Sequence, residues 1–297
     1  MACYHPWTAF RTSAGDVVFV ERGDVVEALT LACGQCWGCR LERSRQWAVR
    51  CMHEASLYED NVFVTLTYDD DHLPPGASLH YPDFQRFMKR LRRRFSSARP
   101  RFYMCGEYGE TFGRPHFHVC LFNFRFPDQV YFSKSPSGHR LFRSAVLEAL
   151  WPFGHSYIGA VTFESAAYVA RYVMKKITGD RAAAHYRVVD TSTGEVFDRA
   201  PEFNHMSLKP GIGRPWLDRY FPDIRADGKV VVNGRKARAP RYYEKFFESV
   251  DPDSAEALAY GRYLESLQYV GERSSERLAV REQVAIAAGS HFVRSIA

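Results

Sequence analysis

The order of apolar patterns between residues 62 and 178 limits the possible folds of this chain more than any other feature. Four segments rich in β-branched and aromatic residues are typical of strands, and three amphipathic segments are typical of helices. They follow one another as β-α-β-β-α-β-α, which indicates an α+β fold with helices around a central antiparallel sheet. The strands are expected at 61–68, 101–106, 115–124 and 156–163, and the helices at 81–95, 144–152 and 165–177.

The composition is that of a globular protein with a modest basic excess. Of the 297 residues, 46% are hydrophobic and 25% charged, and the formal net charge is +6, which suits a polyanionic partner. We expect a Cys-rich segment at 1–60, a core at 61–180 and an extension at 181–297. Because we find no secretory signal and no run of about 18 apolar residues, we expect a soluble, cytosolic protein without membrane contact.

Two histidines, His116 and His118, interrupt an otherwise apolar strand. Side chains alternate along a strand, so both imidazoles point to one face, while Phe117 points to the other. Two imidazoles on one face form half of a metal site. We expect the third ligand from the preceding strand at Glu107, with Glu110 as the second choice. Such a set leaves coordination positions open, as catalytic sites do; the alternative is a solvated face without metal.

The helical pattern at 167–176 carries two tyrosines four residues apart, Tyr168 and Tyr172, which therefore share one face. A basic residue follows each of them three positions later, Arg171 and Lys175. A phenol is a weak nucleophile at its ordinary pKa of about 10, but adjacent positive charge favours the phenolate and a metal makes its target more electrophilic. The pattern predicts phosphodiester transesterification. The alternative is an amphipathic helix whose tyrosines pack against the sheet.

Three cysteines spaced by two residues, Cys33, Cys36 and Cys39, form a compact group of thiols. In a reducing compartment such a group favours a metal over disulfides. Tetrahedral zinc needs a fourth ligand, for which we choose Cys3. The other candidates for that position are His5, Cys51 and His53. The spacing also fits three ligands of a ferredoxin-type iron–sulfur cluster, but the fourth cysteine of that run is missing. We prefer structural zinc to that cluster and to reduced cysteines without metal.

Two basic segments suit single-stranded DNA, because cations bind phosphates and neighbouring aromatic rings stack on bases. The first lies on the helix expected at 81–95, and Tyr242 and Tyr243 follow the second. The predicted DNA-contacting residues are Lys89, Arg90, Arg92, Arg93 and Arg94 in the first segment and Arg235, Lys236, Arg238 and Arg241 in the second. The alternative for both segments is a solvated surface.

Three segments resemble motifs of rolling-circle replication initiators of the HUH superfamily, in which a hydrophobic residue separates two histidines. They are FVTLTY at 63–68, GEYGETFGRPHFH at 106–118 and YVARYVMKK at 168–176, in the order found in that family. The family usually has lysine where Arg171 stands. The segments CGQCWGCRLERSRQWAVRCMHE at 33–54 and SLKPGIGRPWL at 207–217 are similar to parts of the replication initiators of small single-stranded DNA phages, the Microviridae, especially the gokushovirus type.

The resemblance implies a two-tyrosine HUH endonuclease that uses Mg²⁺ or Mn²⁺. One tyrosine would attack the origin of the circular phage genome and keep the 5′ phosphate as a phosphotyrosine, while the free 3′ hydroxyl primes a host polymerase. The second tyrosine would cut the regenerated origin, and rejoining of the ends would release a circle. The implied partners are origin and single-stranded DNA and the host helicase and polymerase, in the cytoplasm of the bacterial host.

Two other interpretations remain. A transposase or plasmid relaxase would share the chemistry, although two tyrosines four apart argue against single-tyrosine versions. A non-enzymatic, zinc-stabilised protein that binds or packages single-stranded DNA would explain the charge and the cysteines. It would leave His116, His118 and the paired tyrosines without a function.

Overall fold

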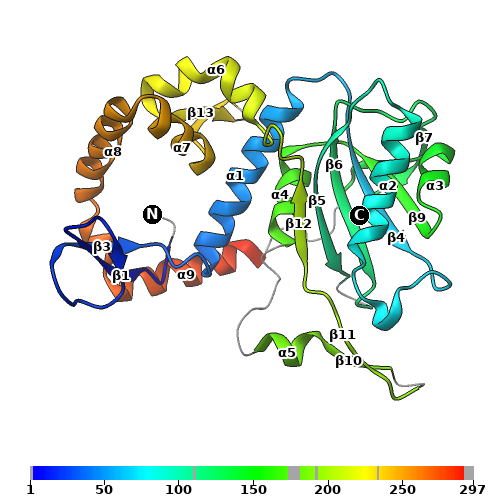
Figure 1. Ribbon diagram of the computed structural model, residues 1–297, viewed down its shortest axis with the longest axis horizontal. Coiled ribbons are helices and arrows are strands. Elements are labelled where there is room, and N and C mark those ends of the chain that lie inside the picture. The colour runs from blue at the N-terminus through cyan, green and yellow to red at the C-terminus, as the bar shows by residue number, and fades with distance from the viewer. Residues whose placement is uncertain (1–2, 110–111, 173–180, 191–192, 233, 291–297) are drawn as a thin grey trace. The chain divides into compact units, whose positions relative to one another are not determined.

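The computed structural model describes residues 3–109, 112–172, 181–190, 193–232 and 234–290 (Figure 1). The chain divides into two compact units, a smaller one of residues 1–45 with 246–292 and a larger one of residues 46–245 with 293–297. The boundaries expected near residues 60 and 180 differ from this division. Helix α1 (Trp37–Ala55) contains the division between the two units at residues 45 and 46, and strand β12 (Phe203–Met206) returns from beyond residue 180 to the sheet of the core.

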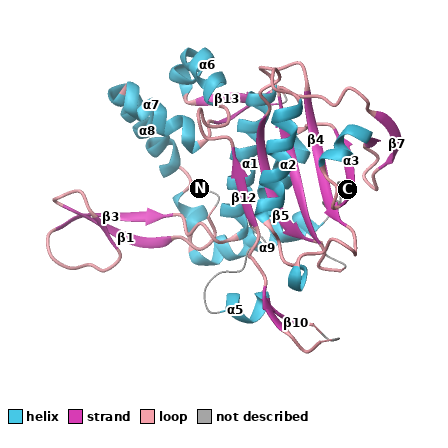
Figure 2. Cartoon of the chain, turned by 45° about the vertical axis from the view of Figure 1, so that its right-hand side comes forward, coloured by secondary structure: helices cyan, strands magenta, loops and turns pink. Residues whose placement is uncertain are grey.

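Within the described residues, seven strands of the larger unit form one antiparallel sheet, in the order β12-β5-β6-β4-β9-β8-β7 (Figure 1). The four expected strands are present as β4 (Asn61–Tyr68), β5 (Arg101–Tyr108), β6 (Pro115–Phe122) and β9 (Gly154–Gly159). The hairpin of β7 (Val130–Lys134) and β8 (Arg140–Arg143) was not predicted and forms one edge of the sheet (Figure 2). The predicted α+β class with a central antiparallel sheet is confirmed.

Each face of the sheet packs against its own layer of helices. On one face, α2 (Tyr81–Arg94) and α3 (Ala145–Leu150) cover side chains such as Phe117, Val119 and Leu66. On the other face, α4 (Phe163–Tyr172) and the second half of α1 pack against β5 and β6. Pro82 in the first turn and the buried stripe of Phe84, Phe87 and Leu91 explain why α2 forms where the sequence predicted it.

Helix α4 begins with a reciprocal cap. It starts at Phe163, two residues before the start expected from the sequence at residue 165. The N–H of Ser165 donates to Oγ1 of Thr162, and the N–H of Thr162 donates to Oγ of Ser165. Thr162 is therefore the N-cap and Ser165 the third helical residue of a capping box. This cap fixes where α4 starts on the sheet, and with it the position of Tyr168.

The larger unit continues after α4 with further helices and hairpins. They are α5 (Arg181–Tyr186), the hairpin of β10 (Arg187–Val189) and β11 (Val196–Asp198), α6 (Arg214–Asp227), the hairpin of β13 (Lys229–Val232) and β14 (Arg235–Arg238), and the first half of α7 (Arg241–Val250), which contains the division between the units at residues 245 and 246. A short 3-10 helix, η1, lies at Pro75–Ala77.

Where α1, α6 and α7 meet, His53 is buried in an aromatic stack. Its ring lies 3.5 Å from that of Trp216, centroid to centroid, and its Nδ1 lies 3.1 Å from the hydroxyl of Tyr243. Among the described residues, its Nε2 has no hydrogen-bond partner. Burial lowers the pKa of His53 to about 4, because a charged imidazole would lose its hydration here.

The smaller unit combines a small sheet with two long helices. Its strands are β1 (Trp7–Thr12), β2 (Val17–Val18) and β3 (Val25–Leu31), in the order β2-β1-β3. Its C-terminal part holds α8 (Pro252–Leu267), the 3-10 helix η2 (Val270–Arg273) and α9 (Ser275–Ser290). None of the helices described in either unit has the length and apolar character that a membrane span requires.

Candidate active site and cysteine cluster

His118 lies at the centre of a polar site on the face that α4 covers. Its Nε2 is 2.7 Å from Oε1 of Glu107 on β5, and its Nδ1 is 3.0 Å from Oγ1 of Thr65 on β4. His118 and Glu107 are each only 2% exposed. The strand register explains this meeting, because Thr65 and Cys105 lie directly opposite His118 on the two neighbouring strands. Sequence reasoning missed Thr65, whose position opposite His118 depends on a register that one strand alone does not reveal.

His116 lies one pleat further along β6, directly opposite Glu107 on β5. Its ring centre is 5.8 Å from that of His118, and as predicted both rings are on the face opposite to Phe117. The backbone of Gly109 packs against this ring, because a Cβ at position 109 would come within 2.9 Å of Nε2 of His116. Glycine at this position therefore makes room for the imidazole.

Helix α4 places the first predicted tyrosine beside this site. The ring of Tyr168 lies 5.1 Å from the ring of His118, edge to face, and its side chain is buried. Tyr172 belongs to the last turn of α4, but its side chain is outside the described part, as are Lys175 and the second-choice ligand Glu110. Arg171 is half-buried near the end of α4.

The chemistry of these side chains fits a divalent ion. Nε2 of His118 and Oε1 of Glu107 are 2.7 Å apart, which is a hydrogen-bond distance. Neighbouring ligands of an octahedral ion with bonds of ~2.1 Å are ~3.0 Å apart, so these two atoms would move slightly apart to hold an ion. If Nε2 serves as a ligand, the ring proton is on Nδ1 and is donated to Thr65, which orients the ring. His116 is less closely grouped with these two. Among the described residues, only the cysteine cluster brings three or more potential ligand atoms within 4.8 Å of one another.

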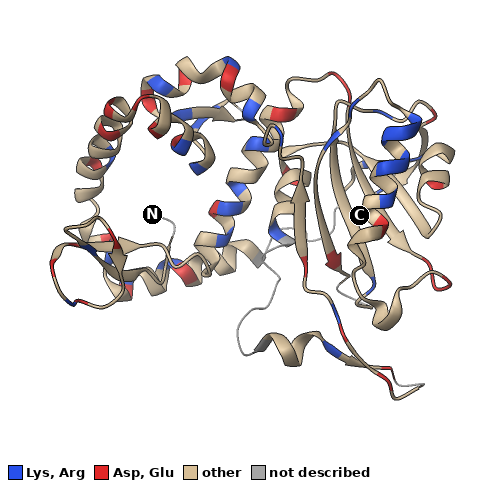
Figure 3. Ribbon diagram, viewed as in Figure 1, with Lys and Arg blue, Asp and Glu red and all other residues tan. Residues whose placement is uncertain are grey.

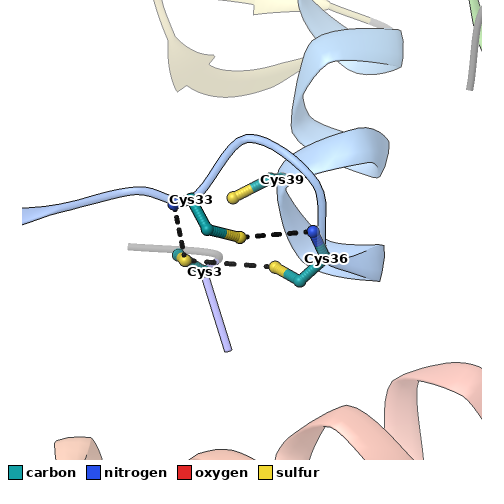
Figure 4. Close-up of side chains that lie close together, drawn as sticks. All are labelled: Cys3, Cys33, Cys36 and Cys39. Carbon is teal, nitrogen blue, oxygen red and sulfur yellow. Dashed lines mark hydrogen bonds between the residues drawn. The ribbon is translucent and has the colours of Figure 1, made fainter. Parts of the chain in front are cut away.

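The cysteine cluster consists of Cys3, Cys33, Cys36 and Cys39, whose four sulfur atoms lie within 4.8 Å of one another (Figure 4). The N–H of Cys33 donates to Sγ of Cys3, and the N–H of Cys36 donates to Sγ of Cys33, both at 3.3 Å. The structure thus brings together the four cysteines that the sequence grouped, and this largely buried cluster could hold a structural metal ion.

The alternatives for the fourth position lie elsewhere. Cys51 is buried in the core of the larger unit beside α4, and His53 belongs to the aromatic stack. His5 contacts Glu282 at 2.6 Å. Burial opposes ionisation of the Cys36 thiol, but the N–H of Tyr4, which donates to its sulfur at 3.3 Å, helps to lower its pKa to about 6. A thiolate is thereby favoured at Cys36, as a metal ligand requires, whereas burial raises the pKa of Cys3 and of Cys39.

The two basic segments differ in their surroundings. Figure 3 shows basic residues along α2, which packs on the face of the sheet opposite to His118. In the second segment, most of the cations contact carboxylates of the chain itself: Lys236 pairs with Asp227 at 2.8 Å, and Arg238 and Arg241 pair with Glu244 at 2.8 and 3.5 Å. DNA contacts by either segment remain a prediction.

One of the two tyrosines after the second segment is not available for the base stacking that the sequence suggested. Tyr243 is fully buried and hydrogen-bonded with His53, so it cannot stack on a base. Tyr242 covers the guanidinium of Arg50, which lies 4.1 Å from its ring centre and 4.0 Å from that of Trp47. These rings stabilise the packing of α1 against α7.

Comparison with known proteins adds to this picture. The family model of the replication-associated protein ORF2 matches residues 61–177. The chain is 35% identical over 263 residues to replication-associated protein VP4 of Bdellovibrio phage phiMH2K, which covers 85% of this chain and 79% of that protein. It is 28% identical over 309 residues to replication-associated protein ORF2 of Spiroplasma virus 4, covering 96% and 90%. It is 29% identical over 236 residues to replication-associated protein ORF4 of Chlamydia phage 1, covering 76% and 55%.

No solved structure matches the chain. The fold defines an α+β protein with a polar site on one face of an antiparallel sheet. The sequence matches show that the chain belongs to the family of replication-associated proteins of the Microviridae.

Proposed function

We propose that this protein takes part in phage genome replication as a metal-dependent endonuclease that nicks and rejoins DNA at the origin. One observation carries the proposal: the ring of Tyr168 lies 5.1 Å from His118, whose Nε2 contacts Glu107. A potential nucleophile and potential ligands of a divalent ion thus meet on one face of the sheet. The names of the related proteins, which are replication-associated, support the same role.

The reaction is the transfer of a phosphoryl group to a tyrosine. The phenolic oxygen bonds to phosphorus and loses its proton, while the bond to the 3′ oxygen breaks and that oxygen gains a proton. A Mg²⁺ or Mn²⁺ ion held by His116, His118 and Glu107 would make the phosphate more electrophilic. Thr65 keeps the ring of His118 in place through its Nδ1. Arg171 and Lys175 supply positive charge that favours the phenolates of Tyr168 and Tyr172.

The second tyrosine completes a cycle of cutting and joining. After one tyrosine holds the 5′ phosphate, the other cuts the regenerated origin, and the new 3′ hydroxyl displaces the first tyrosine to close a circle. The energy of the broken bond is kept in the phosphotyrosine ester, so joining needs no nucleotide. In this proposal the protein acts in the cytoplasm of the bacterial host, with the host helicase and polymerase as partners.

The test is to incubate the protein with circular single-stranded DNA and Mg²⁺ or Mn²⁺ and to look for an adduct that resists denaturation. We expect such an adduct, and peptide mapping should locate it at Tyr168 or Tyr172. A mobility shift without any adduct would contradict the proposal and favour the non-enzymatic binding protein. His53→Phe provides a control, because His53 lies in the aromatic stack and not on the sheet face.

For the cysteine cluster we propose one structural zinc ion per chain. Four thiols match the closed tetrahedral set of structural zinc sites. Elemental analysis should find about one zinc per colourless protein molecule, and Cys36→Ser should reduce the zinc content and the stability more than the chemistry. Cys120→Ser is a control, because that thiol is buried in the core of the larger unit. A brown protein that absorbs near 400 nm would contradict zinc and indicate an iron–sulfur cluster.

A further inference from the structure

The sheet face that carries His118 continues beyond the candidate active site. Thr65 lies opposite His118 on one side and opposite Tyr157 of β9 on the other, so Tyr157 lies two strands away on the same face. Here the face is open to solvent: Tyr157 is half-buried and His155 is exposed. On the reverse face of the same strand Ile158 is 1% exposed. The open face therefore begins where the buried polar site ends.

An aromatic cluster with a basic residue lies at the far side of this open face. The ring of Phe132 on β7 lies 5.7 Å from the ring of Tyr157. The guanidinium of Arg143 on β8 lies 5.5 Å from the ring centre of Phe132. Phe132 is 49% exposed, and Arg143 is half exposed and forms a surface ion pair with Glu148 at 2.7 Å. The β7–β8 hairpin thus carries an exposed aromatic ring and a cation on the same face of the sheet as the candidate active site.

We infer that Tyr157, Phe132 and Arg143 form a stacking platform for bases of the single-stranded DNA that leads into the candidate active site. The inference rests on the proposed function. Aromatic faces bind bases of any sequence, and an adjacent guanidinium reaches a phosphate or stacks with them. Continuity with the face of His118 identifies the occupant, because a strand whose phosphate lies at that site can pass directly over Thr65 and Tyr157.

The neighbouring residue offers a matched control. Tyr131 precedes Phe132 in β7 and is equally exposed, at 49%. Its ring contacts Phe142, which lies opposite Ile158 and therefore on the reverse face of the sheet. The guanidinium of Arg140 lies 5.2 Å from the Tyr131 ring centre, so ring and cation are paired on that face too. The two sets lie on opposite sides of the sheet, and Arg143 is in addition paired with Glu148.

The experiment measures binding of a fluorescein-labelled, mixed-sequence single-stranded oligonucleotide to the full-length protein in EDTA, where cleavage does not interfere. Phe132→Ala should weaken binding about tenfold, because loss of base stacking has an effect of that order. Phe132→Leu should weaken it similarly while keeping an apolar side chain, and Phe132→Trp should preserve it. Tyr131→Ala should change it less than twofold. Thermal unfolding of each variant checks that the fold is intact.

Photocrosslinking provides a second readout. An oligonucleotide with 5-iododeoxyuridine should crosslink to Phe132 or Tyr157, as mapped on peptides. Equal effects of Phe132→Ala and Tyr131→Ala, or crosslinks confined to the reverse face, would overturn the platform. The adduct assay separates the two proposals. An adduct with unaffected binding of Phe132→Ala refutes the platform alone, whereas dependence on Phe132 without any adduct refutes the nuclease and leaves the platform supported as a DNA-binding surface.

Discussion

The two faces of the seven-stranded sheet use the same strands for different purposes. On the face covered by α2 and α3, Phe117, Val119 and Leu66 are completely buried among apolar side chains. On the other face the intervening positions are His118, Glu107 and Thr65, which are also buried but contact one another through polar atoms. Buried polar groups are tolerated when they are hydrogen-bonded. Adjacent residues of one strand can therefore serve stability and chemistry separately.

The sharpest test of this comparison replaces two neighbouring residues of β6, one on each face of the sheet, by alanine. We expect His118→Ala to abolish adduct formation while DNA binding persists, because the variant loses a proposed ligand of the divalent ion but no phosphate contact. Phe117→Ala should instead lower the free energy of unfolding by about 3–5 kcal/mol, because it leaves a cavity in the apolar core. Cleavage assays and urea unfolding of both variants measure the difference. Full cleavage by His118→Ala, or undiminished cleavage in EDTA, would refute the metal site.

The tyrosines of α4 test whether the polar face holds two nucleophiles. On a short oligonucleotide, Tyr168→Phe and Tyr172→Phe should each retain some cleavage, and the double variant should have none. Circle release should require both phenols, because it passes through two covalent states. We expect Tyr172 to make the first cut, since Lys175 and Lys176 follow it closely in the sequence. If Tyr168→Phe releases unit-length circles at the wild-type rate, Tyr168 is a packing residue.

Much of the sheet could be predicted from the sequence, because its central strands carry their signal locally. In β4, β5 and β6 nearly every residue is buried, and such runs indicate strands without knowledge of their neighbours. The β7–β8 hairpin was missed because its apolar runs are short, with three residues in β7 and two in β8, and most of the hairpin is exposed. Strand β12 was missed because four residues at a sheet edge depend on pairing with β5 for their structure.

The residues of the candidate site also differ in whether the sequence alone could predict them. Strand alternation suffices to place His116 and His118 on one face of the sheet, and helical periodicity suffices to place Tyr168 and Tyr172 on one face of a helix. The role of Thr65 follows from the pairing of β4 with β6, and that of Gly109 from the space taken by His116. Both depend on tertiary structure. The same holds for Tyr243, whose exposed appearance in a basic segment gave no sign of the buried stack around His53.

His53 is a second buried imidazole, and its burial lowers its pKa. Because its folded pKa is about 4, below the ordinary 6.5, the unfolded chain binds the proton first as the pH falls. The contribution of neutral His53 to the free energy of unfolding is complete above pH 6.5 and is lost progressively as the pH falls toward 4. We expect a loss of about 2 kcal/mol between pH 7 and pH 5. Urea unfolding of wild type and His53→Phe should show it as a difference between their pH profiles, and parallel profiles would refute it.

The smallest effect concerns which face of the sheet meets DNA. Arg92 and Arg93 project from α2, behind the sheet relative to His118, so a strand that contacts them must pass around an edge of the sheet. Arg92 also donates to the carbonyl of Pro100 at 3.3 Å.

If both arginines contact phosphates, the double variant Arg92→Gln/Arg93→Gln should reduce the slope of log binding constant against log salt by about 1.4, or ~0.7 per contact with single-stranded DNA. Arg143→Gln, on the face of His118, should reduce the slope by about 0.7 in the same titration. A reduced slope for Arg143→Gln and an unchanged slope for the α2 variant would show that DNA binds to the face of His118 and not to α2. The arginines of α2 would then be solvated surface, and the two faces would differ in binding as they do in chemistry.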